Sequence, residues 1–106
     1  FTKHMNQGYH EVMEGIELKT LTYGDKTLQS GFVSPPGMSF LSHPHEQAGF
    51  LVSGRLILII GDKEFETTPG DSWCIPSGQE HSAKILEKSI AVEVFSPVIT
   101  DYLTFL

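Results

Sequence analysis

Cysteine and long apolar runs are scarce in this 106-residue chain. A single cysteine, Cys74, excludes an intrachain disulfide and fits a reducing compartment. The longest apolar run, residues 56–60, is too short to cross a bilayer as a helix. The first residues also lack the apolar run of a signal peptide, so we expect a cytoplasmic protein with no membrane-spanning segment.

Positive charge is scarce as well, and this limits the classes of partner. The chain has 7 lysines and arginines against 13 aspartates and glutamates, which gives a net charge of −6. Nucleic acids and anionic membranes are bound by basic surfaces. The charge balance therefore argues against a nucleic-acid partner and against a membrane partner.

The remaining composition is that of a folded domain built from strands. With 40% hydrophobic and 19% charged residues, the chain is not disordered, and its length fits one domain over residues 1–106. Helical periodicity is absent after the first dozen residues, while 10 glycines and 6 prolines punctuate the chain at turn-like intervals. The segments between them predict strands over residues 16–23, 26–34, 48–53, 55–60, 63–67, 72–75, 81–86 and 89–95.

These short strands predict an all-β fold, either a sandwich or a barrel. We expect Gly61 and Asp62 to form a two-residue hairpin turn, and Gly54 to separate a second antiparallel pair. The run 56–60 is apolar on both faces, which predicts cover by a second layer or by a partner subunit. We therefore expect a homodimer that buries part of this run or the phenylalanine-rich ends.

Two histidines gather in residues 42–47, which read Ser-His-Pro-His-Glu-Gln. In an extended strand alternate side chains share a face, so His43, His45 and Gln47 point one way and Glu46 points the other. Imidazole and side-chain carbonyl groups at this spacing suit a divalent transition metal. A polar loop with two surface histidines is the alternative interpretation of the same pattern.

A second ordered segment, residues 70–81, runs from a glycine turn through a short strand and a Pro-x-Gly turn to a histidine. An antiparallel barrel can bring this segment opposite residues 42–47. The segment resembles the second conserved motif of the cupin family. The matching residues are Gly70, Pro76, Gly78 and His81.

The resemblance to cupins covers about residues 37–103 and implies a cupin-type antiparallel β-barrel, a double-stranded β-helix of jelly-roll type. It also implies a divalent metal ion (nickel, zinc, iron or manganese) held by His43, Gln47 and His81. Leu41 stands where the family places a further histidine, and His45 on the same strand face is a substitute for it. Cupins commonly dimerise, so the resemblance also favours a homodimer.

A third segment carries an acidic residue within an alternating strand. Glu93 and Phe95 share one face, and a buried Glu93 would be a general acid or base with its pKa raised by desolvation. A solvated edge is the alternative. The segment resembles the small cupins that ketonise unsaturated uronates, which implies that Glu93 is catalytic and that Phe95 contacts substrate. Ile99 stands where that group has an arginine.

The aromatic Trp73 is expected in the barrel wall or the substrate pocket, and Cys74 on the opposite face as a buried, inert thiol. The function that follows is a metal-binding cupin acting on a small polar molecule such as a sugar acid, by isomerase or ketonisation chemistry. A non-catalytic cupin that binds or senses a small ligand, and a metal-dependent dioxygenase, are the alternatives.

Overall fold

The computed structural model of the chain describes Lys3 and residues 9–13, 16–23, 28–34, 36–41 and 46–96. Every regular element in these residues is a β-strand, which confirms the all-β fold class. No described residues form a helix long and apolar enough to span a membrane. The strands are β1 (His10–Met13), β2 (Ile16–Tyr23), β3 (Leu28–Ser34), β4 (Gly37–Leu41), β5 (Glu46–Ile60), β6 (Lys63–Thr67), β7 (Ser72–Ile75) and β8 (His81–Ser96).

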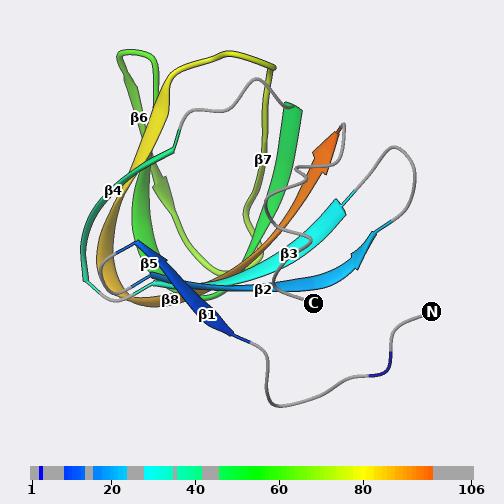
Figure 1. Cartoon of the computed structure of the whole chain (residues 1–106). Helices are drawn as coiled ribbons and strands as arrows, with labels where there is room; N and C mark the ends of the chain where they lie inside the picture. The colour runs from blue at the N-terminus through cyan, green and yellow to red at the C-terminus, as the bar shows by residue number, and fades with distance from the viewer. Residues whose placement is uncertain are drawn as a thin grey trace.

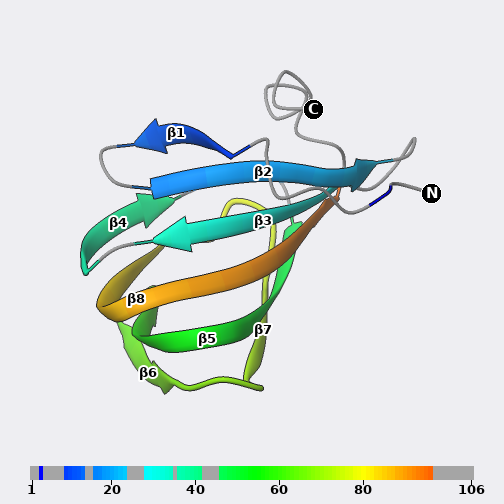
Figure 2. The same cartoon turned by 90° about the horizontal axis from the view of Figure 1, so that it is seen from below.

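The strands form one antiparallel sheet built around the two long strands β5 and β8. The hydrogen-bonded order is β1-β2-β3-β8-β5-β6, with β4 added to β8 and β7 added to β5. In Figure 2 the strands β1, β2, β3, β8 and β5 follow one another as neighbours across the sheet. Figure 1 shows that β5 and β8 are strongly curved, so that each strand forms part of both walls of the barrel.

One predicted hairpin is wrong and the other is confirmed. Residues 48–53 and 55–60 belong to the single strand β5, and the pairing of β5 with β8 shifts register on either side of Ser53 and Arg55. Gly54 lies in this bulge with φ +95°, a conformation that bends the strand instead of reversing it. Residues 81–86 and 89–95 are likewise parts of one strand, β8. The turn at residues 61–62 does pair Ile60 with Lys63.

The core follows from strand alternation around the curved sheet. Along β5, Leu56 and Leu58 are buried, at 4% and 6% exposure, and the residues between them face outward and are part-exposed. One face of the two-sided apolar run 56–60 is therefore a core face of this chain. The cluster at the centre of the core consists of Leu51, Leu56, Leu58, Ile75, Ile85 and Ala91.

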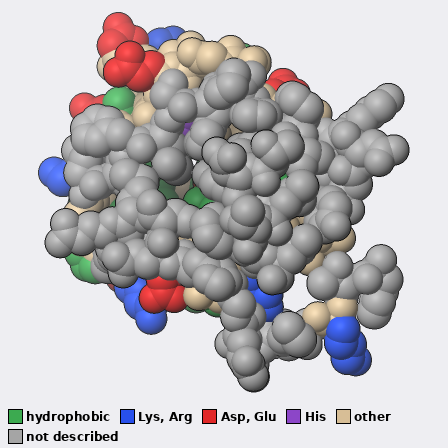
Figure 3. Space-filling model, viewed as in Figure 1, with side chains coloured by type: hydrophobic (Ala, Val, Ile, Leu, Met, Phe, Trp, Pro, Cys, Tyr) green, Lys and Arg blue, Asp and Glu red, His purple; other side chains and the backbone are tan. Residues whose placement is uncertain are grey.

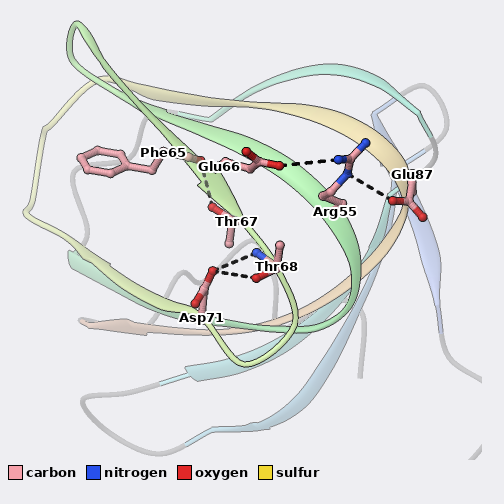
Figure 4. Close-up of polar contacts among 7 residues, drawn as sticks. All are labelled: Arg55, Phe65, Glu66, Thr67, Thr68, Asp71 and Glu87. Atoms are coloured by element: carbon pink, nitrogen blue, oxygen red, sulfur yellow. Dashed lines mark hydrogen bonds and ion pairs between the residues drawn. The ribbon is translucent and has the colours of Figure 1, made fainter.

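The ion pairs of Arg55 lie on the outside of the described structure. Arg55 contacts Glu66 at 3.5 Å and Glu87 at 3.2 Å, as Figure 4 shows, and all three side chains are about half exposed or more. Asp71 accepts hydrogen bonds from the backbone and the hydroxyl of Thr68 and closes the turn between β6 and β7. In Figure 3, acidic and basic side chains lie around the rim of the visible face. Such exposed pairs add little to stability, so the apolar core carries the fold.

Candidate functional site

The buried polar side chains of the described residues include three that the sequence marks as candidate site residues, and all three lie on the long strands β5 and β8. Gln47 on β5 is 2% exposed, and Glu93 and His81 on β8 are each 6% exposed. Glu93 shares its inward face with the buried Ala91 and Phe95. Of the two interpretations of Glu93, the structure therefore has the buried one and not the solvated edge.

Strand register brings Glu93 together with two hydrogen-bond donors. Gly49 of β5 lies between Glu93 of β8 and Trp73 of β7, paired with both. The indole of Trp73 donates a hydrogen bond to the Glu93 carboxylate across this glycine. Gln47 lies diagonally across from Glu93, and its amide Nε2 donates to Glu93 Oε2.

The environment of Glu93 changes its acidity. Burial raises the pKa of the Glu93 carboxyl from its ordinary 4.5 to about 7, and the hydrogen bonds from Trp73 and Gln47 offset part of that rise. A carboxyl with a pKa near 7 exists in both protonation states at neutral pH. It can therefore accept a proton and return it, which is the requirement for general acid–base catalysis.

The ring of His81 is fixed in one tautomer. Its Nδ1 lies 2.9 Å from the carbonyl oxygen of Gln79, and a carbonyl can only accept, so Nδ1 carries the hydrogen. The lone pair of the neutral ring is then on Nε2, which is buried. Metal-ligating histidines are oriented in the same way, by a hydrogen bond from the nitrogen that does not bind the metal.

Two of the four predicted metal ligands belong to the described residues, namely Gln47 and His81. His43 and His45 lie outside the described residues. Within the described part of the chain, no three His, Cys, Asp or Glu side chains are grouped closely enough to hold a metal ion. The two donors that are described fit a divalent transition metal. The Gln47 amide nitrogen faces Glu93, so its carbonyl oxygen would be the atom left to bind a metal ion, and His81 would offer an imidazole nitrogen.

Trp73 also lines a cavity of about 340 Å³ between β6 and β7. This volume is at the lower end of the range for small-molecule sites. Its lining includes apolar side chains from β5 and β6, those of Leu58, Ile60 and Phe65, and also the carboxylate residue Asp71. The cavity therefore suits a small ligand that has an apolar face and polar groups.

A sequence profile for the cupin domain matches residues 25–97, which is more than half of the chain. The chain belongs to the cupin family. Cupins often bind a metal ion, and the family membership confirms the resemblance inferred from the sequence. No curated protein sequence matches this cupin significantly.

Solved structures agree with the family assignment. KdgF from Halomonas sp. is 25% identical to this cupin, with a TM-score of 0.82, over 88% of this chain and 90% of that one. An RmlC-like cupin from Shewanella frigidimarina is 20% identical, with a TM-score of 0.83, over 95% and 96% of the two chains. A predicted oxalate decarboxylase from Thermotoga maritima is 17% identical, with a TM-score of 0.71, over 85% and 90%. The last two matches show the shared fold.

Phe95 lies in the interior of this cupin, whereas Cys74 lies on its surface. Phe95 is fully buried, and its ring packs edge-on against Phe32 with 6.3 Å between the ring centroids. It lies next to Glu93 on the inner face but does not line the 340 Å³ cavity, and its contact with substrate stays a prediction. The expected burial of Cys74 is wrong: this residue lies on the outer face of β7 and is exposed, with its Sγ 4.0 Å from Glu46 Oε1.

The sequence interpretation did not include Gly49 in the site. This glycine is buried in the interior of β5, where a strand ordinarily places a side chain that packs. A glycine at an inward strand position often marks the close approach of another group, and that signal was available in the sequence. The identity of the approaching group depends on the pairing of β5 with β7. The pattern of residues in the sequence does not determine that pairing.

Proposed function

We propose that this cupin binds a divalent metal ion and acts on a small polar molecule of the sugar-acid class, by isomerase or ketonisation chemistry. The observation that carries the proposal is the buried carboxyl of Glu93, held by two donors and with a pKa of about 7. Converting an enol to a ketone removes a proton from oxygen and delivers one to carbon. A carboxyl that changes protonation state at neutral pH is suited to both transfers.

Each described residue of the site has a separate part in this proposal. Glu93 moves the proton, while Gln47 and Trp73 hold its carboxyl and stabilise the charged form. Gln47 and His81, together with His43 and His45, would hold the metal ion. Such an ion supplies Lewis-acid polarisation of a carbonyl or hydroxyl oxygen when bound. Trp73 would link the ligand to these groups, because its ring also lines the cavity of about 340 Å³, whose lining does not include Glu93, Gln47 or His81.

Two comparisons support the sugar-acid class. The segment around Glu93 resembles the uronate-ketonising cupins in its acidic residue and its Phe-Ser-Pro sequence. KdgF from Halomonas sp. shares the fold over most of both chains at 25% identity. We also expect a cytoplasmic location, because the one cysteine, Cys74, is a free thiol exposed to solvent.

The proposal is tested by turnover of an unsaturated uronate, measured with the wild type and with Glu93→Gln at equal metal content. We expect the variant to lose at least about a hundredfold in rate, because it cannot exchange a proton. Glu46→Gln is the matched control, since Glu46 lies on the outer face of β5 and should keep the full rate. An active wild type whose Glu93→Gln variant keeps full rate and full metal would remove Glu93 from the chemistry.

A second function, binding or sensing of a small ligand without turnover, is favoured by the positions of the basic residues. Among the described residues, Lys3, Lys63, Lys84, Lys88 and Arg55 are exposed, and Lys19 lies 6.0 Å from the ring of the exposed Tyr9. None of these described cations faces the interior, where a sugar-acid carboxylate would need a partner. Saturable binding of the uronate by a metal-loaded wild type without turnover would support this function and contradict the first.

A further inference from the structure

We propose that Gly49 and Trp73 form a positioning pair for Glu93, in which the missing side chain at residue 49 admits the indole and the indole N–H orients the carboxyl. The catalytic meaning of this pair rests on the function proposed above for Glu93. The geometry is independent of that function, because it concerns only how residues 49, 73 and 93 contact one another on neighbouring strands.

The space over Gly49 is filled by the tryptophan ring. A Cβ atom built at residue 49 would lie 2.2 Å from Cε2, 2.3 Å from Nε1 and 2.4 Å from Cζ2 of Trp73. Such distances are far below van der Waals contact, so any larger residue must displace the indole. Gly49 does not have a positive φ, and the requirement for glycine is therefore steric and not conformational.

The strand order explains why a glycine is needed at this point. β7 and β8 are both neighbours of β5, so Trp73 and Glu93 start from strands about 10 Å apart. They meet only by reaching over the residue between them, which is Gly49. A side chain at that position would stand between the indole and the carboxylate.

Trp73 differs from Gln47 as a donor to Glu93. An indole nitrogen can only donate, whereas a glutamine amide can present either its nitrogen or its oxygen. The indole can therefore only donate to the Glu93 carboxyl group. The same ring lines the 340 Å³ cavity, so a ligand that contacts Trp73 there also contacts the group that orients Glu93.

The experiment uses the single tryptophan of the chain, which gives one indole N–H signal in a nitrogen–proton NMR spectrum. We expect this signal to be shifted downfield by the carboxylate in the wild type at pH 8, and to move upfield in Glu93→Gln and in Gly49→Ala. Gly31→Ala is the matched control. Gly31 is a strand glycine without a positive φ, and a Cβ there would lie 3.1 Å from the hydroxyl of Tyr9 and at ordinary contact distance, 3.9 Å, from Leu21. An unchanged indole signal in Gly49→Ala would overturn the proposal, whether or not the wild type turns over a uronate.

A second measurement covers the case in which Gly49→Ala does not fold. The same substitution made in a Trp73→Ala background should then restore folding, because the indole that clashes with the new methyl group is gone. A double variant that is still unfolded while Trp73→Ala folds would contradict the proposal. For an active wild type, Trp73→Phe keeps an aromatic ring, smaller than the indole, and removes the N–H, and we expect kcat to fall about tenfold with little change in KM. An unchanged kcat in this variant would overturn the positioning role.

Discussion

At the scale of single residues, the interior acid Glu93 is set among apolar neighbours. It is 6% exposed and shares its face of β8 with Ala91 and Phe95. Taking a carboxylate out of water is costly unless hydrogen bonds replace the lost hydration. Gln47 and Trp73 replace part of it, and the remaining cost is visible as the raised pKa of Glu93. A stability cost of this kind is typical of functional sites.

The raised pKa predicts how stability depends on pH in the metal-free protein. The pKa of Glu93 is about 7 in the folded state and 4.5 in its ordinary, unfolded environment. Below pH 4.5 both states hold the proton. Between pH 4.5 and 7 the unfolded state releases it first, so the free energy of unfolding falls as pH rises. Above pH 7 the loss is complete, at roughly 3 kcal/mol.

Glu93→Gln should remove this pH dependence, because glutamine resembles the protonated acid and does not titrate. Urea unfolding at acid pH and at pH 8 measures the effect in both proteins. At pH 8 the variant is expected to be more stable than the wild type by up to about 3 kcal/mol. Identical pH profiles for the two proteins would contradict the buried position of the titrating group.

At the scale of strands, alternation predicted which face of its strand each of several candidate residues occupies. It placed Gln47 and Glu46 on opposite faces of one strand, and Glu93 with Phe95 on a single face, and the structure has both arrangements. Alternation depends only on neighbouring residues, so it can be followed along the sequence. The hydrogen bond between Gln47 and Glu93 joins strands 46 residues apart, and only the register of β5 with β8 creates it.

Gly54 shows why the local sequence pattern wrongly predicted a hairpin within β5. A glycine between two apolar runs is compatible with a hairpin turn and with a bulge in one bent strand. Packing decides between the turn and the bulge, because Gly54 lies against the backbone of Lys88 and Ser89 in β8. That partner segment is more than thirty residues away in the sequence.

The bulge predicts a large stability effect at Gly54. A Cβ there would lie 2.4 Å from the carbonyl oxygen of Lys88 and 2.6 Å from Cα of Ser89, in addition to the strain of a positive φ. We expect Gly54→Ala to cost about 2–4 kcal/mol of unfolding free energy. Gly70→Ala is the control, since Gly70 has φ +97° but nothing within 4 Å of its Cβ position, and should cost only about 1 kcal/mol. Equal costs in denaturant unfolding would contradict the close packing of β5 on β8.

At the scale of the whole molecule, an apolar outer face predicts self-association. Phe50 and Val52 are 47% and 48% exposed and lie two residues apart on the outward face of β5. The inward residues of the run 56–60 are occupied in the core of this chain, so this outer face is the better candidate for a contact. On a chain with a net charge of −6, an uncharged face is also where two copies repel each other least.

We therefore expect a homodimer in solution that buries this outer face. Sedimentation equilibrium at micromolar concentration should give twice the chain mass for the wild type. Phe50→Lys should shift the equilibrium toward the monomer, because it places a charge in the contact. A monomeric wild type under these conditions would contradict the prediction.

The central claim is that the interior around Gln47 and His81 is a metal site with Glu93 beside it, and elemental analysis of the purified, metal-loaded protein tests it most directly. We expect about one transition-metal ion per chain in the wild type, and in Glu46→Gln as the outer-face control. His81→Ala and Gln47→Leu should each lose most of this metal while remaining folded. A wild type that takes up no metal, or a folded His81→Ala that keeps a full complement, would contradict the claim.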